Sequence, residues 1–373
     1  MSTFCENDHR FMSMAIALAK FGVYTTSPNP NVGCVLVKNN EVIATGYHLQ
    51  AGKGHAEVNA LAKVTAQQSE HCTAYVTLEP CSHVGKTGSC AQALIAAKVT
   101  KVICAMQDPN PLVTGNGFSL LRAAGIEVVV GLMSEQAKAL NPGFIKRMSQ
   151  QLPWVNIKLA MSLDGRTAMQ SGESQWITGP AARADVQRLR AQSCAIITGI
   201  GSIQHDDSSL MVREHELELD ANDFDLELIK QKQPLRVVLD SNNQLAKHAK
   251  IINQPGRTLR VIACPKTEDN DDIICMANHS GKIDLQALLQ YLAKVEQCNN
   301  VLVEAGATLA GSFVENGLFD QLTVYMAPTI LGAKARPLLA IDKDYMAQQQ
   351  RLQVVDQCIV GDDIRLTYQP VIK

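Results

Sequence analysis

Two short segments carry residue types that together could bind a catalytic metal ion. His55 and Glu57 open a helix-forming stretch, and Cys81 follows an apolar strand-like run, with Cys90 eight intervening residues later. A helix N-terminus lowers the pKa of a thiol and a bound metal lowers it further, so we expect both sulfurs as thiolates. One imidazole and two thiolates leave the fourth tetrahedral position of Zn²⁺ to a water, whose pKa falls to ~7. The pattern therefore predicts a zinc centre that supplies hydroxide at neutral pH.

Glu57 is the candidate proton shuttle of this centre. It stands two residues after His55, and at a first helical turn both side chains lean toward the same helix mouth. A carboxylate beside the metal can move protons from the water to a ring nitrogen and an amine. H-x-E with P-C-x-x-C is a signature of zinc deaminases, although here the gap between the cysteines is wider. Two alternatives are ordinary buried cysteines and a structural zinc with His83 as fourth ligand, but His83 is interpreted more readily as a substrate contact.

Several polar residues could complete a substrate pocket around this centre. Asn29 lies in the rigid turn Pro28-Asn29-Pro30-Asn31 and could face the edge of a base. Others lie in loops or at the ends of predicted strands, where α/β sheets bind ligands. Each could equally be an exposed loop residue or a turn former. The expected deaminase substrate contacts are Asn29, His48, His83, Lys86, Asp108 and Asn110.

The elements that must position these residues alternate in the first half of the chain. Asp8 is the expected N-cap of the first helix, and Asn39-Asn40 the turn between the first two strands. Alternation of this kind predicts a mainly parallel, three-layer α/β sheet. We expect strands at 32–37, 42–46, 74–78, 101–106 and 127–130, and helices at 9–20, 55–64, 90–97, 117–124 and 134–150.

The second half begins again with a strand and ends in a hairpin. The apolar run 301–304 ends in Glu304, and Gly306 opens a turn whose N–H groups could meet a phosphate at a helix N-terminus. The stretch 214–227 holds seven acidic residues and is interpreted as a solvated insertion. The expected strands are 154–161, 194–198, 235–239, 259–263, 301–304 and 322–326, followed by the hairpin strands 352–359 and 363–368.

Length and composition bound the remaining possibilities. A chain of 373 residues fits two domains of roughly 150–200 residues, and Pro153 marks the expected boundary, giving 1–150 and 151–373. Lys and Arg total 34 against 36 Asp and Glu, so the basic excess typical of a nucleic-acid-binding protein is missing. No apolar run approaches the ~20 residues of a membrane helix, and the N-terminus does not read as a secretory signal. Eleven cysteines, mostly in apolar strands, suit reduced thiols, so we expect a cytoplasmic enzyme.

The motifs in sequence resemble the RibD family of bifunctional pyrimidine deaminase/reductases of riboflavin biosynthesis. The resemblance covers about residue 8 to the C-terminus, in the family's order. One departure is Gly88-Ser89 before Cys90, where the family usually has two prolines, but Ser89 can cap the following helix. The matching motifs are Asn29-Pro-Asn-Val-Gly, Gly46-Tyr-His48, Gly52-Lys-Gly-His55-Ala-Glu57, Glu79-Pro-Cys81-Ser-His83-Val-Gly-Lys86, Lys158-Leu-Ala160-Met-Ser162-Leu-Asp164, Ser171-Gly-Glu-Ser174-Gln-Trp176 and Asp206-Asp-Ser-Ser-Leu210-Met-Val-Arg213.

The resemblance implies a cytidine-deaminase-like α/β/α domain, followed by a dihydrofolate-reductase-like α/β domain. The first would deaminate 2,5-diamino-6-(5-phosphoribosylamino)pyrimidin-4(3H)-one with one Zn²⁺ per chain. The second would use NADPH to reduce the ribosyl chain of 5-amino-6-(5-phosphoribosylamino)uracil. A homo-oligomer, dimer or tetramer, through the reductase domain is also expected. The implied NADPH contacts are Ala160, Trp176, Ser202, Asp206, Ser241 and the loop Gly306, Ala307, Thr308, Leu309, Ala310, Gly311 and Ser312.

By the same resemblance, Ser174, Arg190, Leu210, Arg213 and Glu304 hold the reductase substrate. The two arginines suit its phosphate, because a guanidinium can bind two phosphate oxygens at once; the alternative is that they are exposed and unpaired. Lys158 and Asp164 are expected near the nicotinamide, without an assigned proton-transfer role.

Two other functions share parts of this pattern. A nucleic-acid base deaminase would use the same H-x-E chemistry, but the acidic balance and the wide cysteine spacing disfavour it. A non-catalytic binding protein would hold a structural zinc and a vestigial nucleotide fold. Titration of RNA binding against salt separates the first from a small-molecule enzyme, and a test for NADPH oxidation separates the second.

Overall fold

The computed structural model describes residues 4–82, 88–111, 113–265, 270 and 272–371. The chain divides into two compact units, Met1–Gln151 and Leu152–Lys373, and each is described by itself. No described helix combines the length and apolar character that crossing a bilayer requires.

The first unit is built on a five-stranded sheet with the order β2-β1-β3-β4-β5. β1 is antiparallel to β2 and to β3, whereas β3, β4 and β5 are parallel, so the sheet is mixed rather than mainly parallel. Asn39 and Asn40 both have positive φ between β1 and β2, as a type I′ hairpin turn requires. The strands are β1 Gly33–Lys38, β2 Glu41–Tyr47, β3 Thr73–Val76, β4 Lys101–Cys104 and β5 Glu127–Val130.

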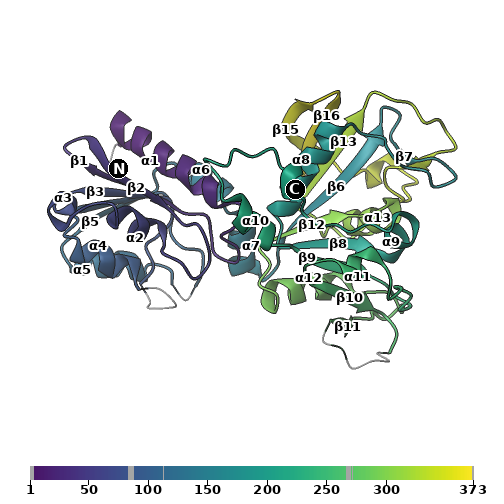
Figure 1. The fold of residues 1–373 in the computed structure, drawn as a ribbon, viewed down its shortest axis with the longest axis horizontal. Coiled ribbons are helices and arrows are strands. Elements are labelled where there is room, and N and C mark those ends of the chain that lie inside the picture. The colour runs from purple at the N-terminus through teal and green to yellow at the C-terminus, as the bar shows by residue number, and fades with distance from the viewer. Residues whose placement is uncertain (1–3, 83–87, 112, 266–269, 271, 372–373) are drawn as a thin grey trace. The chain divides into compact units, whose positions relative to one another are not determined.

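Helices cover both faces of this sheet, which gives three layers (Figure 1). Successive residues of β1 alternate between the two cores, because side chains of a strand point to opposite faces. Val35 packs on the side of α1, and Leu36 on the side of α2, α4 and α5. The helices are α1 Glu6–Ala19, α2 Ala56–Leu61, α3 Ala66–Ser69, α4 Cys90–Ala96, α5 Asn116–Ala123, α6 Ser134–Ala139 and α7 Pro142–Gln150, with the 3₁₀ turn η1 Lys20–Gly22.

Two helix expectations in this unit were wrong in detail. α1 begins at Glu6 with Cys5 as N-cap, and Asp8 instead accepts a bond from the Cys5 N–H from inside the first turn, at 2.9 Å. The single helix expected over 134–150 is two helices, because Pro142 starts α7. A proline cannot continue a helix but suits the first position of a new one.

The second unit is built on a nine-stranded sheet with the order β11-β10-β9-β8-β12-β6-β13-β16-β15. Its strands are parallel from β11 to β13, and the terminal hairpin of β15 and β16 is antiparallel. A separate pair joins β7 and β14. The strands are β6 Trp154–Ser162, β7 Arg166–Ala168, β8 Ala195–Gly199, β9 Leu235–Leu239, β10 Thr258–Ile262, β11 Ile273–Cys275, β12 Asn300–Glu304, β13 Gln321–Ala327, β14 Arg336–Pro337, β15 Leu352–Val360 and β16 Asp363–Pro370.

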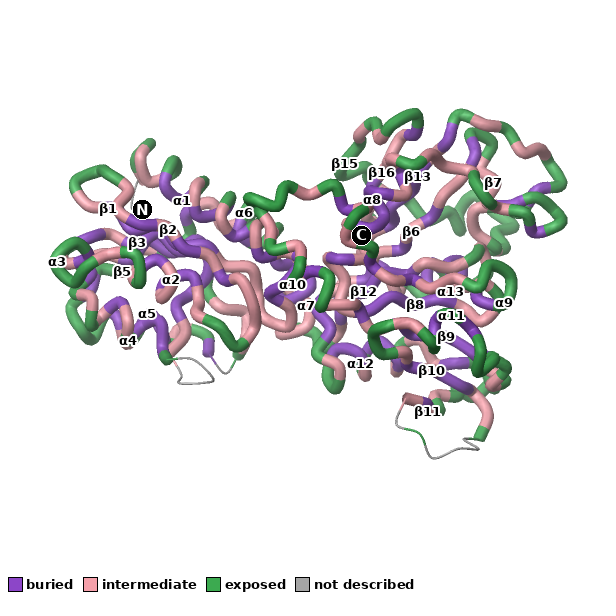
Figure 2. The backbone as a smooth tube through the Cα atoms, viewed as in Figure 1, coloured by how far each residue is buried: buried purple, intermediate pink, exposed green. Residues whose placement is uncertain are grey.

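The central strands of this sheet are buried between helices (Figure 2). On one face α12 and α13 pack against Ile157, Val237 and Val303. On the other, α9 and α11 pack against Ile196 and Val238. The helices are α8 Pro180–Ala191, α9 Ile200–Asp206, α10 Leu226–Gln231, α11 Lys250–Asn253, α12 Leu285–Lys294 and α13 Ala307–Glu315, with the 3₁₀ turns η2 Glu214–Glu216 and η3 Met346–Gln348.

Candidate active sites

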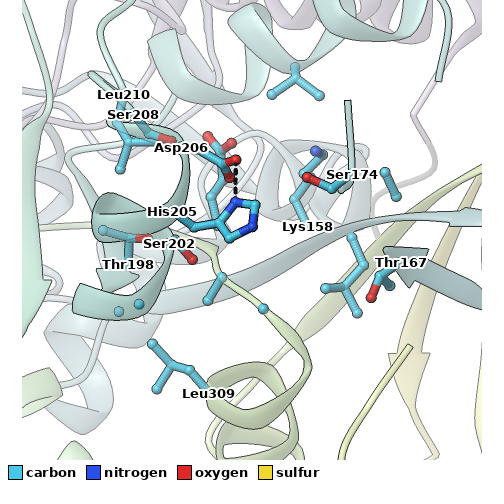
Figure 3. Close-up of a pocket in the computed structure, with 18 of the residues that line it drawn as sticks. Lys158, Thr167, Ser174, Thr198, Ser202, His205, Asp206, Ser208, Leu210 and Leu309 are labelled. Carbon is cyan, nitrogen blue, oxygen red and sulfur yellow. Dashed lines mark hydrogen bonds and ion pairs between the residues drawn. The ribbon is translucent and has the colours of Figure 1, made fainter. Parts of the chain in front are cut away.

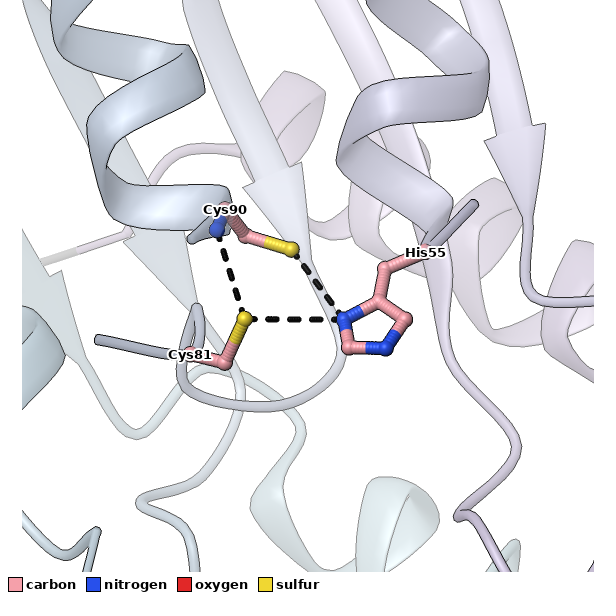
Figure 4. Close-up of side chains that lie close together, drawn as sticks. All are labelled: His55, Cys81 and Cys90. Carbon is pink, nitrogen blue, oxygen red and sulfur yellow. Dashed lines mark hydrogen bonds between the residues drawn. The ribbon is translucent and has the colours of Figure 1, made fainter. Parts of the chain in front are cut away.

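The first unit brings His55, Cys81 and Cys90 together (Figure 4). The Nδ1 atom of His55 lies 3.5 Å from the sulfur of Cys81 and 3.2 Å from that of Cys90. The three potential ligand atoms all lie within 4.8 Å of one another, and no other such group of His, Cys, Asp or Glu occurs among the described residues. An imidazole and two sulfurs converging on one point form a donor set that suits Zn²⁺.

Two of these potential ligands, His55 and Cys90, lie at the N-termini of helices, and Ser89 positions the third, Cys81. His55 is the N-cap of α2, and Cys90 is the first residue of α4. The hydroxyl of Ser89 accepts from the N–H of Gln92 at 3.3 Å and donates to the carbonyl of Cys81 at 2.8 Å. The N–H of Cys90 also points at the sulfur of Cys81, at 3.3 Å. The expected capping role of Ser89 is confirmed, and Ser89 ties the two cysteine segments together.

The surroundings of Cys81 and Cys90 favour a thiolate at one of the two sulfurs. The pKa of Cys81 is lowered to about 4, because the Cys90 thiol and His55 donate hydrogen bonds to its sulfur. The pKa of Cys90 is raised instead, because its proton stabilises the Cys81 thiolate and because the site is buried. Cys81 is therefore the sulfur favoured as a thiolate, and Cys90 the one that keeps its proton. A divalent cation can replace such a proton, since binding a metal to thiols releases protons.

Glu57 is buried beside this group, on the first turn of α2, and is 3% exposed. Burial raises its pKa to about 7, and the charge of His55 opposes part of that rise. A carboxyl group with a pKa near the working pH can both accept and donate a proton.

Two of the expected substrate contacts lie next to the ligands. The ring of His48 packs edge-on against that of His55, with centroids 5.0 Å apart. Nδ1 of His48 lies 3.0 Å from the carbonyl of Gly54, so it carries the proton and donates. Nε2 then accepts from the amide of Asn29 at 3.1 Å. Sequence reasoning expected Asn29 and His48 at this pocket, and they form one hydrogen-bonded chain beside the ligands.

Asp108 and Asn110 lie in the segment after β4, next to the segment after β3 that carries Cys81. The Asp108 carboxylate accepts from the N–H of Asn110 at 2.8 Å. The expected contacts His83 and Lys86 lie outside the described residues.

Glu79 is a residue of this site that sequence reasoning missed. It precedes Pro80-Cys81, is 4% exposed, and accepts backbone N–H bonds from Asp108 at 3.2 Å, Gly115 at 3.0 Å and Gly117 at 3.0 Å. Glu79 therefore holds the loop 108–117 against the segment of Cys81. The signal in the sequence was an acidic residue at the buried end of a strand.

The second unit contains a cavity of about 2220 Å³ at the carboxyl ends of β6, β8, β9 and β12 (Figure 3). All five expected substrate residues line it: Ser174, Arg190, Leu210, Arg213 and Glu304. Of the expected NADPH contacts, those lining it are Ala160, Trp176, Ser202, Asp206, Ser241, Gly306, Ala307, Thr308, Leu309 and Ser312. Figure 3 also shows Asp206 bonded to the ring of His205, at 3.0 Å.

The segment expected as the loop 306–312 is mostly helical. Gly306 is the N-cap of α13, which begins at Ala307. Ala310 and Gly311 do not line the cavity but are buried behind it. A Cβ atom at position 311 would lie 2.7 Å from the carbonyl oxygen of Ala340, so this glycine allows close packing.

The two arginines expected to hold phosphate are both paired with carboxylates, so the alternative of unpaired arginines was wrong, although Arg213 is exposed. Arg190 donates from Nε and Nη2 to Glu304 at 2.6 and 2.8 Å, and from Nη1 to the carbonyl of Met211 at 3.3 Å. Arg213 is more exposed and pairs with Glu216.

Lys158 lines the cavity, whereas Asp164 does not. The carboxylate of Asp164 accepts from the hydroxyl of Ser162 and from the N–H groups of Leu331 and Gly332. The Ser162 bond and these backbone donors lower the pKa of Asp164 to about 2. Asp164 therefore anchors the loop after β13.

Comparison with known proteins identifies both units. The model of the cytidine and deoxycytidylate deaminase zinc-binding region matches residues 5–106, and that of the RibD C-terminal domain matches residues 153–366. The riboflavin biosynthesis protein RibD of Escherichia coli K12 is 47% identical over 366 residues, covering 96% of this chain and 98% of that protein. That of Haemophilus influenzae is 45% identical, covering 99% of each.

Solved structures give the same result. Acinetobacter baumannii RibD, form 1, superposes with a TM-score of 0.90 at 46% identity, covering 98% of this chain and 99% of that one. A Thermotoga maritima deaminase/reductase superposes with a TM-score of 0.84 at 28% identity and the same coverage. The expected cytidine-deaminase-like and reductase domains are therefore confirmed, and the chain belongs to the RibD family of bifunctional deaminase/reductases of riboflavin biosynthesis.

Proposed function

We propose that the unit Met1–Gln151 deaminates 2,5-diamino-6-(5-phosphoribosylamino)pyrimidin-4(3H)-one with Zn²⁺ held by His55, Cys81 and Cys90. The convergence of these three ligand atoms next to the buried Glu57 carries the proposal. When bound, Zn²⁺ supplies a water whose pKa is lowered to ~7. The Glu57 carboxyl group would hold and pass protons between the water of the site and the departing amine, because a buried carboxyl whose pKa is raised to about 7 can both accept and donate a proton.

Asn29 and His48 orient the pyrimidine in this proposal. Because Nε2 of His48 accepts from the Asn29 amide nitrogen, the amide oxygen of Asn29 is left to accept an N–H of the ring. Asp108 and Asn110 lie in a loop that Glu79 holds next to Cys81, and they would contact the rest of the substrate.

The unit Leu152–Lys373 then reduces the ribosyl chain of 5-amino-6-(5-phosphoribosylamino)uracil, with NADPH as the reductant. Its cavity exceeds the 300–1,000 Å³ of ordinary small-molecule pockets, which suits a dinucleotide together with a substrate. The N-terminus of α13 opens on it after Gly306, an arrangement that favours a phosphate. When bound, NADPH supplies the hydride, while Ser174, Leu210, Arg213 and Glu304 position the sugar phosphate.

A coupled assay on the phosphorylated pyrimidine tests both assignments. Ammonia release and the absorbance of the reduced nicotinamide are followed with and without a zinc chelator. The chelator should stop ammonia release and spare nicotinamide oxidation when the deaminated substrate is supplied. Ammonia release that survives complete removal of the metal would refute the zinc assignment.

A nucleic-acid base deaminase is the second candidate that shares the ligand set, but no observation favours it. The proposal also includes a homo-oligomer formed through the reductase unit, which sedimentation of the full chain tests.

A further inference from the structure

Part of the acidic stretch 214–227 packs on the reductase cavity instead of standing in solvent. Glu214–Glu216 form the turn η2, directly after Arg213. His215 and Glu216 line the cavity, and Leu217 is fully buried. The expectation of a solvated insertion was therefore wrong for Leu217 and for the partly covered Glu216, which lies where the substrate is proposed to bind.

Glu216, Arg213 and Gln187 form a closed ring of hydrogen bonds. The carboxylate of Glu216 accepts a hydrogen bond from Nη2 of Arg213 at 2.7 Å, and its other oxygen lies 2.6 Å from Nε in the same ion pair. Gln187, on α8 and 1% exposed, donates from its amide to Glu216 at 3.2 Å. Its amide oxygen accepts the backbone N–H of Arg213 at 3.1 Å. The side chain and the backbone of Arg213 are thus both fixed.

This ring leaves one edge of the Arg213 guanidinium for a ligand. A guanidinium presents two pairs of donors, Nε with Nη2 and Nη1 with Nη2, and either pair can bind two oxygens. Glu216 lies against the first pair, through the Nη2 hydrogen bond and the Nε ion-pair contact, and among the described residues none accepts a hydrogen bond from Nη1. In Arg190 the same first pair is bound to Glu304, but Nη1 donates to Met211. Its side chain is 13% exposed, against 44% for Arg213.

We propose that Glu216 and Gln187 are positioning residues that hold Arg213 with its Nη1–Nη2 edge ready for the 5′-phosphate of the reductase substrate. The inference rests on the proposed phosphate contact of Arg213 and extends it to a part of the acidic stretch. A flexible arginine would lose side-chain freedom when the phosphate binds, whereas an arginine already fixed loses little. The carboxylate also places a negative charge near the phosphate, which works against binding. The direction in which KM changes when Glu216 is replaced therefore decides whether Glu216 helps or opposes phosphate binding.

Steady-state reductase kinetics of Glu216→Ala and Glu216→Gln test the inference. The substrates are the phosphorylated uracil compound and its 5′-dephosphorylated form. Glu216→Ala should raise KM for the phosphorylated compound about 3- to 10-fold, the range expected for fixing one long side chain, while kcat changes far less. Glu216→Gln keeps an oxygen that accepts from Arg213 and should recover most of the loss. The dephosphorylated compound should show no such dependence on position 216.

Glu214→Ala is the matched control, because Glu214 belongs to the same acidic stretch but pairs with Lys230 at 3.5 Å and does not line the cavity. A lower KM in both Glu216 variants would overturn the inference, because the carboxylate would then compete with the phosphate. An equal rise for both substrates would overturn it too, because it would indicate general loss of packing. Arg213→Ala tests the proposed contact between Arg213 and the phosphate. If this variant shows no rise in KM specific to the phosphorylated compound, the contact is wrong, whatever the role of Glu216.

Discussion

Lys158 and Glu304 lie directly opposite each other on the neighbouring parallel strands β6 and β12, and Glu304 is also bonded twice to Arg190. Burial lowers the pKa of Lys158, and Glu304 opposes that effect. Burial alone would raise the pKa of Glu304, but the charge and hydrogen bonds of Arg190 outweigh it, and the net pKa is lowered. One carboxylate thus compensates two partly buried cations at the wall of the cavity.

Removing this carboxylate should destabilise the second unit strongly. Glu304→Gln leaves Lys158 and Arg190, both partly exposed at the cavity wall, without their counter-charge, and loss of a charged hydrogen-bonded pair costs about 1.5–3 kcal/mol. The double variant Arg190→Met with Glu304→Gln should recover part of that loss. Both tryptophans, Trp154 and Trp176, lie in this unit, so their fluorescence during urea unfolding reports its stability. A double variant no more stable than the single one would show that the unpaired arginine is not the cause.

Glu57→Gln should abolish ammonia release and leave bound zinc in place. The amide has nearly the shape of the carboxyl group but cannot carry a proton between the water and the amine, and general acid–base catalysis contributes about 10²–10⁴-fold. Metal content is measured by elemental analysis, and nicotinamide oxidation with the deaminated substrate is the internal control. Retained deamination in a zinc-loaded variant would refute the shuttle role.

The ligands and Glu57 could be identified in the sequence because their positions follow from local structure. His55 and Cys90 each stand at the start of a helix, and such starts are visible in apolar periodicity and capping residues. The proline that separates α6 from α7 was visible too, but the apolar pattern on both sides of it was taken as one helix.

The contacts that the sequence did not predict join distant segments. Arg190 and Glu304 are 114 positions apart, and no local pattern shows that they pair. Glu216 was taken as one of many solvated acids, because only the fold places η2 on the cavity. Length and charge of a segment indicate its average exposure, not the environment of each residue.

Asp185 should make the second unit sensitive to acid. Its carboxylate is bonded to Tyr325 and Arg365, each at 2.7 Å. Burial raises the pKa of Asp185, but the hydrogen bonds from Tyr325, Arg365 and Arg188 together lower it by more. The net pKa of Asp185 is therefore below its usual value. The carboxylate therefore stabilises the folded state above the unfolded pKa of about 3.9, and this contribution is lost as the pH falls through the lowered folded pKa.

Asp185→Asn should accordingly lower the free energy of unfolding by about 1.5–3 kcal/mol at pH 7, the usual range for hydrogen bonds to a charged group. The difference from the unmodified protein should shrink as the pH falls below about 4. Urea unfolding followed by tryptophan fluorescence at several pH values measures it, with the exposed Asp342→Asn as control. A difference that stays constant down to pH 3 would show that the charge of Asp185 is not what stabilises the unit.

Glu79→Gln should weaken zinc binding without touching a ligand. In the glutamine side chain an NH₂ group replaces one carboxylate oxygen, and this group cannot accept a hydrogen bond. In one orientation of the amide the N–H groups of Asp108 and Gly115 lose their acceptor, and in the other the N–H group of Gly117 loses its acceptor. A buried donor left unsatisfied costs about 1–3 kcal/mol, and because Glu79 lies two residues before Cys81, loosening this segment should lower zinc affinity on the order of 10-fold. Competition with a chromophoric chelator measures the affinity. Glu127→Gln removes only an exposed pair with Lys101 and is the control. If the two variants held zinc equally well, the zinc ligands would not depend on the contacts that Glu79 makes with this loop.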